Sequence, residues 1–256
     1  MPLSGIDCEA LVTYLDEYLD ARRGRDYCPN GLQVEGRRRI HKLVTGVSAC
    51  LPLFERAAEE GADALLVHHG LFWDGDSRAL TGVSYRRVAE LVRSGLLLIA
   101  YHLPLDRHPE VGNNAVAANL LGLADLEPFA PHDGLPLGIA GRFPHPLPAA
   151  ELTERCRRVF AQEPLAFPYG PDPVSTIGIV SGGGQRDLHT AIRQGLDAFI
   201  TGESTEWVMN LSREAGIHYL ACGHYATERL GVQALGDHLA ERFDLEVEFI
   251  DVPNPV

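Results

Sequence analysis

The sequence predicts an α/β fold of two similar lobes, each built on a mostly parallel sheet, and three observations support this prediction. Short apolar runs alternate with amphipathic stretches, as expected when parallel strands are joined by covering helices. Blocks of sequence from the first half recur in the same order in the second half. Polar clusters follow several of the apolar runs, at the strand ends where ligands bind in open α/β sheets.

The predicted first lobe spans residues 1–126 and begins with an amphipathic helix over residues 8–19, followed by a turn-rich loop at 26–36. Apolar runs predict strands at 43–47, 64–67 and 96–100. Helices are predicted at 52–60, 85–94 and 113–121. Pro52 suits a first helical turn, and Gly122 suits a helix end.

The predicted second lobe spans residues 127–256. Residues 124–148 are rich in proline and glycine and are predicted to form an irregular connector. Strands are predicted at 174–180, 198–201 and 219–221, and helices at 149–160, 188–194 and 227–243. The alternating stretch at 245–252 predicts a closing strand, which can join either this lobe or the sheet of the first lobe.

The two halves resemble each other in three blocks. The stretch EGADALLV at 60–67 resembles QGLDAFIT at 194–201, SGLLLIA at 94–100 resembles AGIHYLA at 215–221, and GVS at 46–48 resembles IVS at 179–181. Unrelated strand–helix units also share such residues, so the common order of the blocks is what favours a duplication. A duplicated unit predicts a cleft between the lobes, lined by strand ends.

Composition restricts the classes of partner. The net charge of −13 disfavours binding to nucleic acid and to anionic membranes. No apolar stretch is long enough to span a bilayer, and the N-terminal residues lack the features of a signal peptide. Five scattered cysteines without a C-x-x-C pair indicate reduced thiols. We therefore expect a cytoplasmic protein.

His68 and His69 follow the predicted strand at 64–67 directly. Adjacent side chains of a strand point to opposite faces, so they converge only where the strand ends, and Gly70 permits a bend there. Imidazole is the commonest metal ligand in proteins, and this favours metal binding. The alternative is a pair of buried histidines that are hydrogen-bonded within the core.

His102 and Asp106 follow the predicted strand at 96–100 and enclose Leu-Pro-Leu. Pro104 is expected to keep the segment extended, so that both side chains line one rim. The alternative is that Asp106 caps the next helix, although Asn113 and Asn114 lie nearer to that helix.

His224 and Glu228 lie four residues apart at the start of a predicted helix, and therefore on one face. Apolar residues continue the same stripe, so both side chains are expected to point inward rather than toward water. A buried carboxylate is costly unless it is neutralised, and a cation neutralises it. The alternative is a surface pair with i,i+4 spacing.

Five side chains are thus predicted as metal ligands: His68, His69, Asp106, His224 and Glu228. Mixed imidazole and carboxylate donors without thiolate suit Zn, Mn, Fe or Ni. Five donors exceed what one catalytic ion usually takes, so two divalent ions with a bridging carboxylate, from Glu228 or Asp106, are the simpler arrangement.

Further residues at strand ends are candidates for catalysis or for ligand binding. Glu203 occupies the position of His69 in the repeat and is predicted as a partner of a ligand or as a general base, while His102 and Tyr225 are candidate proton donors. A glycine loop links a strand to a helix, and its amides are predicted to hold an anion such as phosphate; the alternative is a simple tight turn. The residues of this loop are Ser181, Gly182, Gly183 and Gly184.

Seven short motifs, taken in order, carry a resemblance that runs over essentially the whole chain. They are NGLQV at 30–34, VHHG at 67–70, HLPLD at 102–106, GNN at 112–114, SGGG at 181–184, TGE at 201–203 and GHYATE at 223–228. With these motifs the chain resembles the GTP cyclohydrolase I type 2-like proteins, also described as dinuclear metal-centre hexameric proteins. It corresponds to the compact members, which have no inserted domain.

This resemblance implies the same five metal ligands, two divalent ions per subunit and a toroidal homohexamer with its metal sites facing an inner cavity. The family name implies that a metal-bound hydroxide opens the imidazole ring of GTP and that formate is released. A nucleotide or another phosphorylated small molecule is the expected substrate. A non-catalytic metal-binding scaffold or metal-handling regulator is the second interpretation, and a two-metal phosphoesterase is the third.

Overall fold

The computed structural model describes residues 4–256, which form two compact α/β units. Unit 1 comprises the described part of Met1–Val111 together with Gly231–Val252, and unit 2 comprises Gly112–Leu230 and Pro253–Val256. The predicted lobe boundary lay after residue 126. The structure divides the chain after Val111, and again within the long helix α9 (His224–Phe243).

Unit 1 is built on a five-stranded sheet with the order β13-β4-β5-β6-β2. Its strands are β2 (Gly31–Val34), β4 (Lys42–Ser48), β5 (Ala64–His69), β6 (Leu97–Ala100) and β13 (Glu246–Phe249). Strands β13, β4, β5 and β6 are parallel, and β2 runs antiparallel to β6. The predicted loop at 26–36 therefore contains a strand, which was missed because its four residues are too few to show a period. A small ribbon pairs β1 (Ile6–Asp7) with β3 (Arg39–Ile40).

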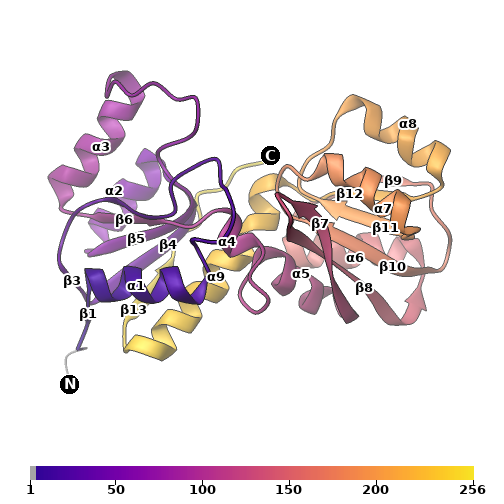
Figure 1. Ribbon diagram of the computed structural model, residues 1–256, viewed down its shortest axis with the longest axis horizontal. Coiled ribbons are helices and arrows are strands. Elements are labelled where there is room, and N and C mark those ends of the chain that lie inside the picture. The colour runs from indigo at the N-terminus through magenta and orange to yellow at the C-terminus, as the bar shows by residue number, and fades with distance from the viewer. Residues whose placement is uncertain (1–3) are drawn as a thin grey trace. The chain divides into compact units, whose positions relative to one another are not determined.

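Helices cover both faces of this sheet (Figure 1). They are α1 (Cys8–Tyr18), α2 (Leu51–Glu59), α3 (Gly82–Ser94), the single turn α4 (Leu103–Asp106) and the last part of α9. On one face, Phe54 of α2 and Leu91 of α3 join the core with strand residues such as Leu65. On α9, the predicted apolar stripe is buried at Val232, Leu235 and Leu239.

Unit 2 is built on a six-stranded sheet with the order β7-β8-β10-β11-β12-β9. Its strands are β7 (Ala124–His132), β8 (Leu135–Leu147), β9 (Leu165–Pro168), β10 (Val174–Val180), β11 (Ala198–Thr201) and β12 (His218–Ala221). Strands β10, β11 and β12 are parallel, and the other three pair antiparallel with their neighbours.

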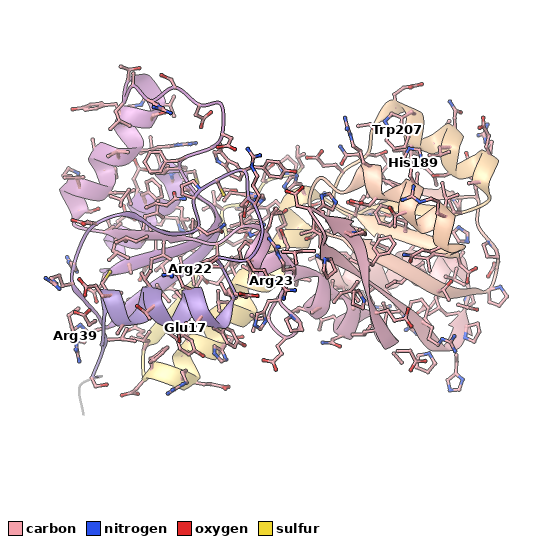
Figure 2. The ribbon with its side chains drawn as sticks, in the orientation of Figure 1. Glu17, Arg22, Arg23, Arg39, His189 and Trp207 are labelled. Carbon is pink, nitrogen blue, oxygen red and sulfur yellow. The ribbon has the colours of Figure 1, made fainter. Side chains whose placement is uncertain are left out.

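The helices of unit 2 lie on the two faces of this sheet (Figure 1). They are α5 (Asn113–Leu121), α6 (Ala149–Phe160), α7 (Leu188–Gln194), which a short 3-10 turn precedes at Gln185–Asp187, and α8 (Glu206–Ala215). α5 and α6 contribute to one core cluster and α7 and α8 to another. Trp207 of α8 stacks on His189 of α7, with ring centroids 5.3 Å apart (Figure 2).

The prediction of an irregular connector at 124–148 is wrong, because β7 and β8 form an antiparallel hairpin there. Prolines lowered the strand signal, yet β7 is an edge strand, where proline is tolerated because ladder hydrogen bonds are missing on one side. The turn is made by Asp133 and Gly134, both with positive φ. Asp-Gly is a strong hairpin signal, so the sequence did contain the evidence for this turn.

The predicted duplication appears as a topology that parts of the two units share. In each unit a helix and an antiparallel edge strand precede three parallel strands that two helices connect. Asp63, before β5, accepts hydrogen bonds at Oδ2 from the amides of His41 and Lys42, at 2.8 and 3.1 Å. Asp197, before β11, accepts at Oδ2 from the two corresponding amides of β10, at 2.8 and 2.9 Å. The aspartate shared by the repeats thus ties two neighbouring strands together.

Replacing Asp63 with asparagine is expected to lower the free energy of unfolding at pH 7 by roughly 1.5–3 kcal/mol, as is typical for hydrogen bonds to a charged group. Burial alone would raise the pKa of this carboxyl, but hydrogen bonds from Arg37 and from the two amides outweigh burial and lower it. The stabilisation is therefore present above the unfolded pKa of about 4, and it is lost as the pH falls through the folded pKa.

Urea unfolding of wild type and Asp63→Asn at pH 7 and pH 3 tests this prediction, since the difference between them should shrink at the lower pH. Asp76→Asn is the matched control, because Asp76 is an exposed carboxylate of the same unit. Equal losses in both variants would contradict the role given to Asp63.

The structure also describes the state of the cysteines and the character of the helices. The cysteines are all free thiols: Cys8, Cys28, Cys50, Cys156 and Cys222. Within residues 4–256, no helix combines the length and the apolar character needed to cross a bilayer.

Candidate metal centre

In unit 1, two adjacent imidazoles lie at the C-terminal end of β5. His68 is fully buried, and its ring centroid lies 4.7 Å from that of His69. Nδ1 of His68 is 3.0 Å from the carbonyl oxygen of Tyr101, and Nδ1 of His69 is 3.1 Å from Oγ of Ser48. Because Nδ1 makes these contacts, Nε2 is the nitrogen that each ring can offer to an ion.

Gly70 follows this pair, and the Gln33 amide group lies close against it, where a Cβ would make Gln33 shift. Oε1 of Gln33 accepts a hydrogen bond from the amide of Leu71 at 2.7 Å. Gln33 therefore fixes the chain as it leaves the histidine pair.

Asp106 lies beside His68, with Oδ2 3.5 Å from Nε2 of the imidazole, and it is only 4% exposed. The expectation that Pro104 keeps this segment extended is wrong. Residues Leu103–Asp106 form one helical turn, and the Asp106 amide donates to the carbonyl oxygen of His102 at 3.2 Å. Proline fits because the first turn of a helix does not use its amide hydrogens.

His102 also belongs to this cluster. Its ring centroid lies 5.0 Å from that of His68 and 5.6 Å from that of His69. Nδ1 of His102 is 2.7 Å from Oδ1 of Asp26. Burial raises the pKa of the Asp26 carboxyl, but contacts with His102, Asn30 and the Tyr27 amide outweigh burial and lower it.

In unit 2, His224 and Glu228 occupy the first turns of α9 with the predicted i,i+4 spacing. Nε2 of His224 is 3.1 Å from Oε2 of Glu228, which is 3% exposed. Nδ1 of His224 is 2.7 Å from Oε1 of Glu203. Burial lowers the pKa of His224, but the two carboxylates outweigh burial and raise the pKa to about 9. This end of α9 therefore favours positive charge.

The contact between Glu203 and Nδ1 of His224 is what the first of its two predicted roles, partner of a ligand, requires, and the role itself stays a prediction. The carbonyl oxygen of Glu203 also accepts a hydrogen bond from the hydroxyl of Tyr219 at 2.5 Å. Tyr225 is buried, and its backbone amide donates to the carbonyl oxygen of Val256 at 2.9 Å. That contact fixes the backbone and leaves the predicted proton-donor role of the phenol a prediction.

The glycine loop is tied into the protein by its own amides. The amide of Ser181 donates to Asn114 Oδ1 at 2.8 Å, that of Gly182 to Thr227 Oγ1 at 2.9 Å, and that of Gly184 to Thr201 Oγ1 at 3.1 Å. Of the four amides predicted to hold an anion, three are thus engaged within unit 2. This geometry favours the alternative of a tight structural turn.

Gly182 of this loop has a positive φ of 61° and lies against the side chains of α9. A Cβ here would collide with Oε1 of Glu228 and lie 3.0 Å from Nε2 of His224. Both features favour glycine, since a side chain here would be strained by the left-handed backbone and would displace the Glu228 carboxylate. The loop therefore shapes the surroundings of the two predicted ligands.

Several residues around the predicted ligands were not predicted. Asp26 lies in a turn-rich loop, and its link to His102 crosses 76 positions of sequence. Asn114, which was considered a helix cap, donates from Nδ2 to the carbonyl oxygen of Leu137 at 2.8 Å, and the N-cap of α5 is Gly112. Of these residues, Ser48 could have been found from the sequence. The repeat pairs it with Ser181, which lies at the end of a predicted strand.

The residues present in unit 1 include a group that could hold a divalent cation, namely His68, His69 and His102. Four imidazoles are held through Nδ1, by a backbone carbonyl oxygen, a hydroxyl or a carboxylate. This arrangement is typical of metal-binding histidines, because the second bond orients the ring and leaves Nε2 for the ion. Buried carboxylates adjoin His68 and His224, as expected for sites that balance positive charge.

The chain matches one protein-family model and curated relatives over nearly its whole length. The family model described as Duf34/NIF3 (NGG1p interacting factor 3) matches residues 6–255. A Pseudomonas aeruginosa protein named "GTP cyclohydrolase 1 type 2 homolog" is 45% identical over 250 residues, which cover 98% of this chain and 99% of the relative. An Escherichia coli protein of the same name is 43% identical, over 94% of this chain and 96% of its own length.

Solved structures share the fold. The structure titled "protein ybgI, unknown function" has a TM-score of 0.93 at 42% identity, over 98% of this chain and 100% of its own. TTHA1606 from Thermus thermophilus has a TM-score of 0.89 at 41% identity, again over 98% and 100%. The resemblance read from the seven motifs is confirmed. With a family model that spans residues 6–255 and relatives of this similarity over nearly the whole chain, the protein belongs to the Duf34/NIF3 family.

Proposed function

We propose that this protein is a dinuclear-metal-dependent hydrolase whose nominal substrate is GTP. The observation that carries the proposal is a set of imidazoles, each held through Nδ1, with the buried carboxylates Asp106 and Glu228 beside two of them, in a chain whose relatives are named GTP cyclohydrolase 1 type 2 homologs. The proposed ligands are His68, His69 and Asp106 of unit 1, and His224 and Glu228 of unit 2. The ion identities are Zn, Mn, Fe or Ni, as the donor types favour.

Divalent ions bound there would lower the pKa of water and polarise the substrate. The residues of this chain would supply position and charge balance. Glu203 orients the ring of His224 through Nδ1, and the backbone of Tyr101 does the same for His68. Glu228 offers a buried carboxylate beside His224, in a place where Gly182 excludes any larger residue.

Under this proposal, water opens the imidazole ring of the purine and one carbon leaves as formate. Assays of released formate and released phosphate, on protein loaded with Mn²⁺ or Zn²⁺ and supplied with GTP, test the proposal directly. Formate release without phosphate is the expected result. Phosphate release without formate would identify a phosphoesterase, and bound metal without any turnover would identify a scaffold or a metal-handling protein.

We also propose the toroidal homohexamer that the family resemblance implies. Light scattering behind size-exclusion chromatography should give the mass of six 28.0 kDa chains. A monomer at micromolar concentration would contradict this part of the proposal.

A further inference from the structure

We propose that Arg107, together with the arginines of the loop at residues 22–25, binds the phosphate groups of an anionic substrate at the surface of unit 1. The loop arginines are Arg22, Arg23 and Arg25. The inference rests on the proposed function for the class of ligand, which is a nucleotide or another phosphorylated small molecule. It assigns the phosphates to a part of the chain other than the glycine loop of unit 2, where the sequence had suggested them.

The first argument is the hydrogen bonding of Arg107, which directly follows Asp106 at the end of the helical turn α4. The side chain is half-buried. Nε donates to the carbonyl oxygen of Leu103 at 3.0 Å, and Nη1 donates to the carbonyl oxygen of Arg23 at 3.4 Å. A guanidinium group carries five N–H groups, so three remain beyond these two bonds. Their planar fork matches the oxygens of a phosphate.

The second argument is the charge around Arg107. Within the described part of the chain, no carboxylate lies at ion-pair distance from its guanidinium group. Burial lowers the pKa of Arg107, while the charges of Asp26, Asp106 and Asp20 act against burial from further away. Each of these three carboxylates has a closer partner, namely His102, His68 and Arg23 respectively. A partly buried positive charge without a carboxylate of its own favours an anionic ligand.

The third argument is that the loop brings further positive charge to α4. The loop backbone contacts this turn twice, because the carbonyl oxygen of Arg23 accepts from Arg107 and Oδ2 of Asp26 accepts from the amide of Leu103 at 3.0 Å. The three loop arginines are exposed, and Arg22 and Arg23 are labelled in Figure 2.

The ion pairs of these loop arginines leave their charge available. Arg22 lies 3.9 Å from Asp16 and Arg23 lies 3.5 Å from Asp20, and both arginine side chains are largely exposed. Exposed ion pairs of this kind contribute little free energy, so an incoming phosphate competes with them easily. In a chain with a net charge of −13, a group of four arginines is a local exception that attracts anions.

A phosphate site made of arginines would also explain how the proposed reaction can release formate without phosphate. Two-metal sites cleave phosphate esters when the ions hold the reacting phosphate itself. Guanidinium groups bind phosphate oxygens by charge-assisted hydrogen bonds and supply no attacking water. Arginines that hold the phosphates would therefore leave the other end of the substrate for the ions.

The test measures anion binding in the absence of metal. Isothermal titration calorimetry would follow inorganic triphosphate binding to the full chain in buffer with a chelator, at low and high salt. We expect binding that weakens with salt. Arg107→Gln should weaken it about 10–100-fold, the usual worth of hydrogen bonds to a charged group. Arg107→Lys keeps the charge without the planar fork and should fall between wild type and Arg107→Gln.

Two further variants complete the comparison. Arg25→Gln changes an exposed side chain and should weaken triphosphate binding several-fold without affecting folding. Arg86→Gln is the matched control, because Arg86 is an exposed arginine on α3 of the same unit, and it should keep wild-type affinity. Circular dichroism checks the folding of each variant. If Arg107→Gln does not fold, Arg25→Gln and Arg107→Lys provide the decisive comparison.

GTP and guanosine distinguish a nucleotide from a free phosphate as the source of the anion. GTP should bind wild type more tightly than guanosine does, and this preference should disappear in Arg107→Gln. Equal affinity of wild type for GTP and guanosine would overturn the assignment to a nucleotide.

The failure of this inference differs from the failure of the proposed function. Wild-type triphosphate affinity in both Arg107→Gln and Arg25→Gln, or no binding by wild type, would overturn the inference whatever the enzyme assays show. Triphosphate binding that these variants lose, in a protein that releases no formate from GTP, would support the phosphate site and remove the proposed reaction.

Discussion

Glu228→Gln is expected to remove at least one of the two proposed ions and to abolish hydrolysis. The substitution keeps the shape of the side chain and removes its charge. Glu228 is 3% exposed and lies 3.1 Å from His224, so the imidazole loses one of the two carboxylates that balance its charge. The loss of metal affinity should exceed the roughly 10–100-fold that removal of an outer-shell partner causes, because a ligand itself is lost.

Metal content per chain, measured by mass spectrometry after dialysis, and formate release together measure this effect. Glu241→Gln is the matched control, since Glu241 is an exposed glutamate of the same helix α9. The control should keep wild-type metal content and activity. Two ions per chain in Glu228→Gln would remove Glu228 from the ligand set.

Gly182→Ala is expected to disrupt the same site without removing any proposed ligand. Its φ of 61° is strained for alanine, and a Cβ would collide with Oε1 of Glu228. The backbone strain costs about 1–3 kcal/mol. Displacement of the Glu228 carboxylate adds to this cost and misplaces a ligand, so metal content should fall as well as stability.

Gly195→Ala separates the two effects. Gly195 has a φ of 68°, almost the same backbone conformation, but nothing lies within 4 Å of a Cβ built there. The Gly195→Ala variant should lose only the stability that the backbone strain costs, and it should keep its metal. Thermal unfolding and metal content of the two variants, measured side by side, give the comparison. Normal metal content in Gly182→Ala would show that the close approach to Glu228 does not matter for the site.

The sequence predicted the repeated part of the fold well. Helices α5, α6 and α7 and strands β10 and β11 have the predicted bounds, because each combines an apolar period with a clear end signal. The hairpin of β7 and β8 was missed because prolines lowered its strand signal. Those of β7 are tolerated at the sheet edge, and those of β8 lie outside the residue pairs that β8 makes with β10. The strand β2 was missed because it is short and pairs with β6, more than 60 positions further on.

The candidate site, too, was predicted correctly in one part and wrongly in others. The spacing of His224 and Glu228 gave their shared helical face directly, since i,i+4 neighbours are fixed by helix geometry. The same spacing in His102 and Asp106 was misinterpreted, because Pro104 suggested an extended segment where the structure has one helical turn. The glycine loop suggested an anion site, and only its hydrogen-bond partners showed that three of its four amides are used within the protein.

By itself, the sequence determined the alternation of strands and helices, the duplication and the donor types at the strand ends. These are local properties, which depend on the period of apolar residues and on short spacings. Only the tertiary structure decided which distant groups meet, such as Asp26 with His102 and Gly182 with Glu228. The physical reason is that such contacts depend on strand register and on packing between segments far apart in the chain, and no local pattern encodes either.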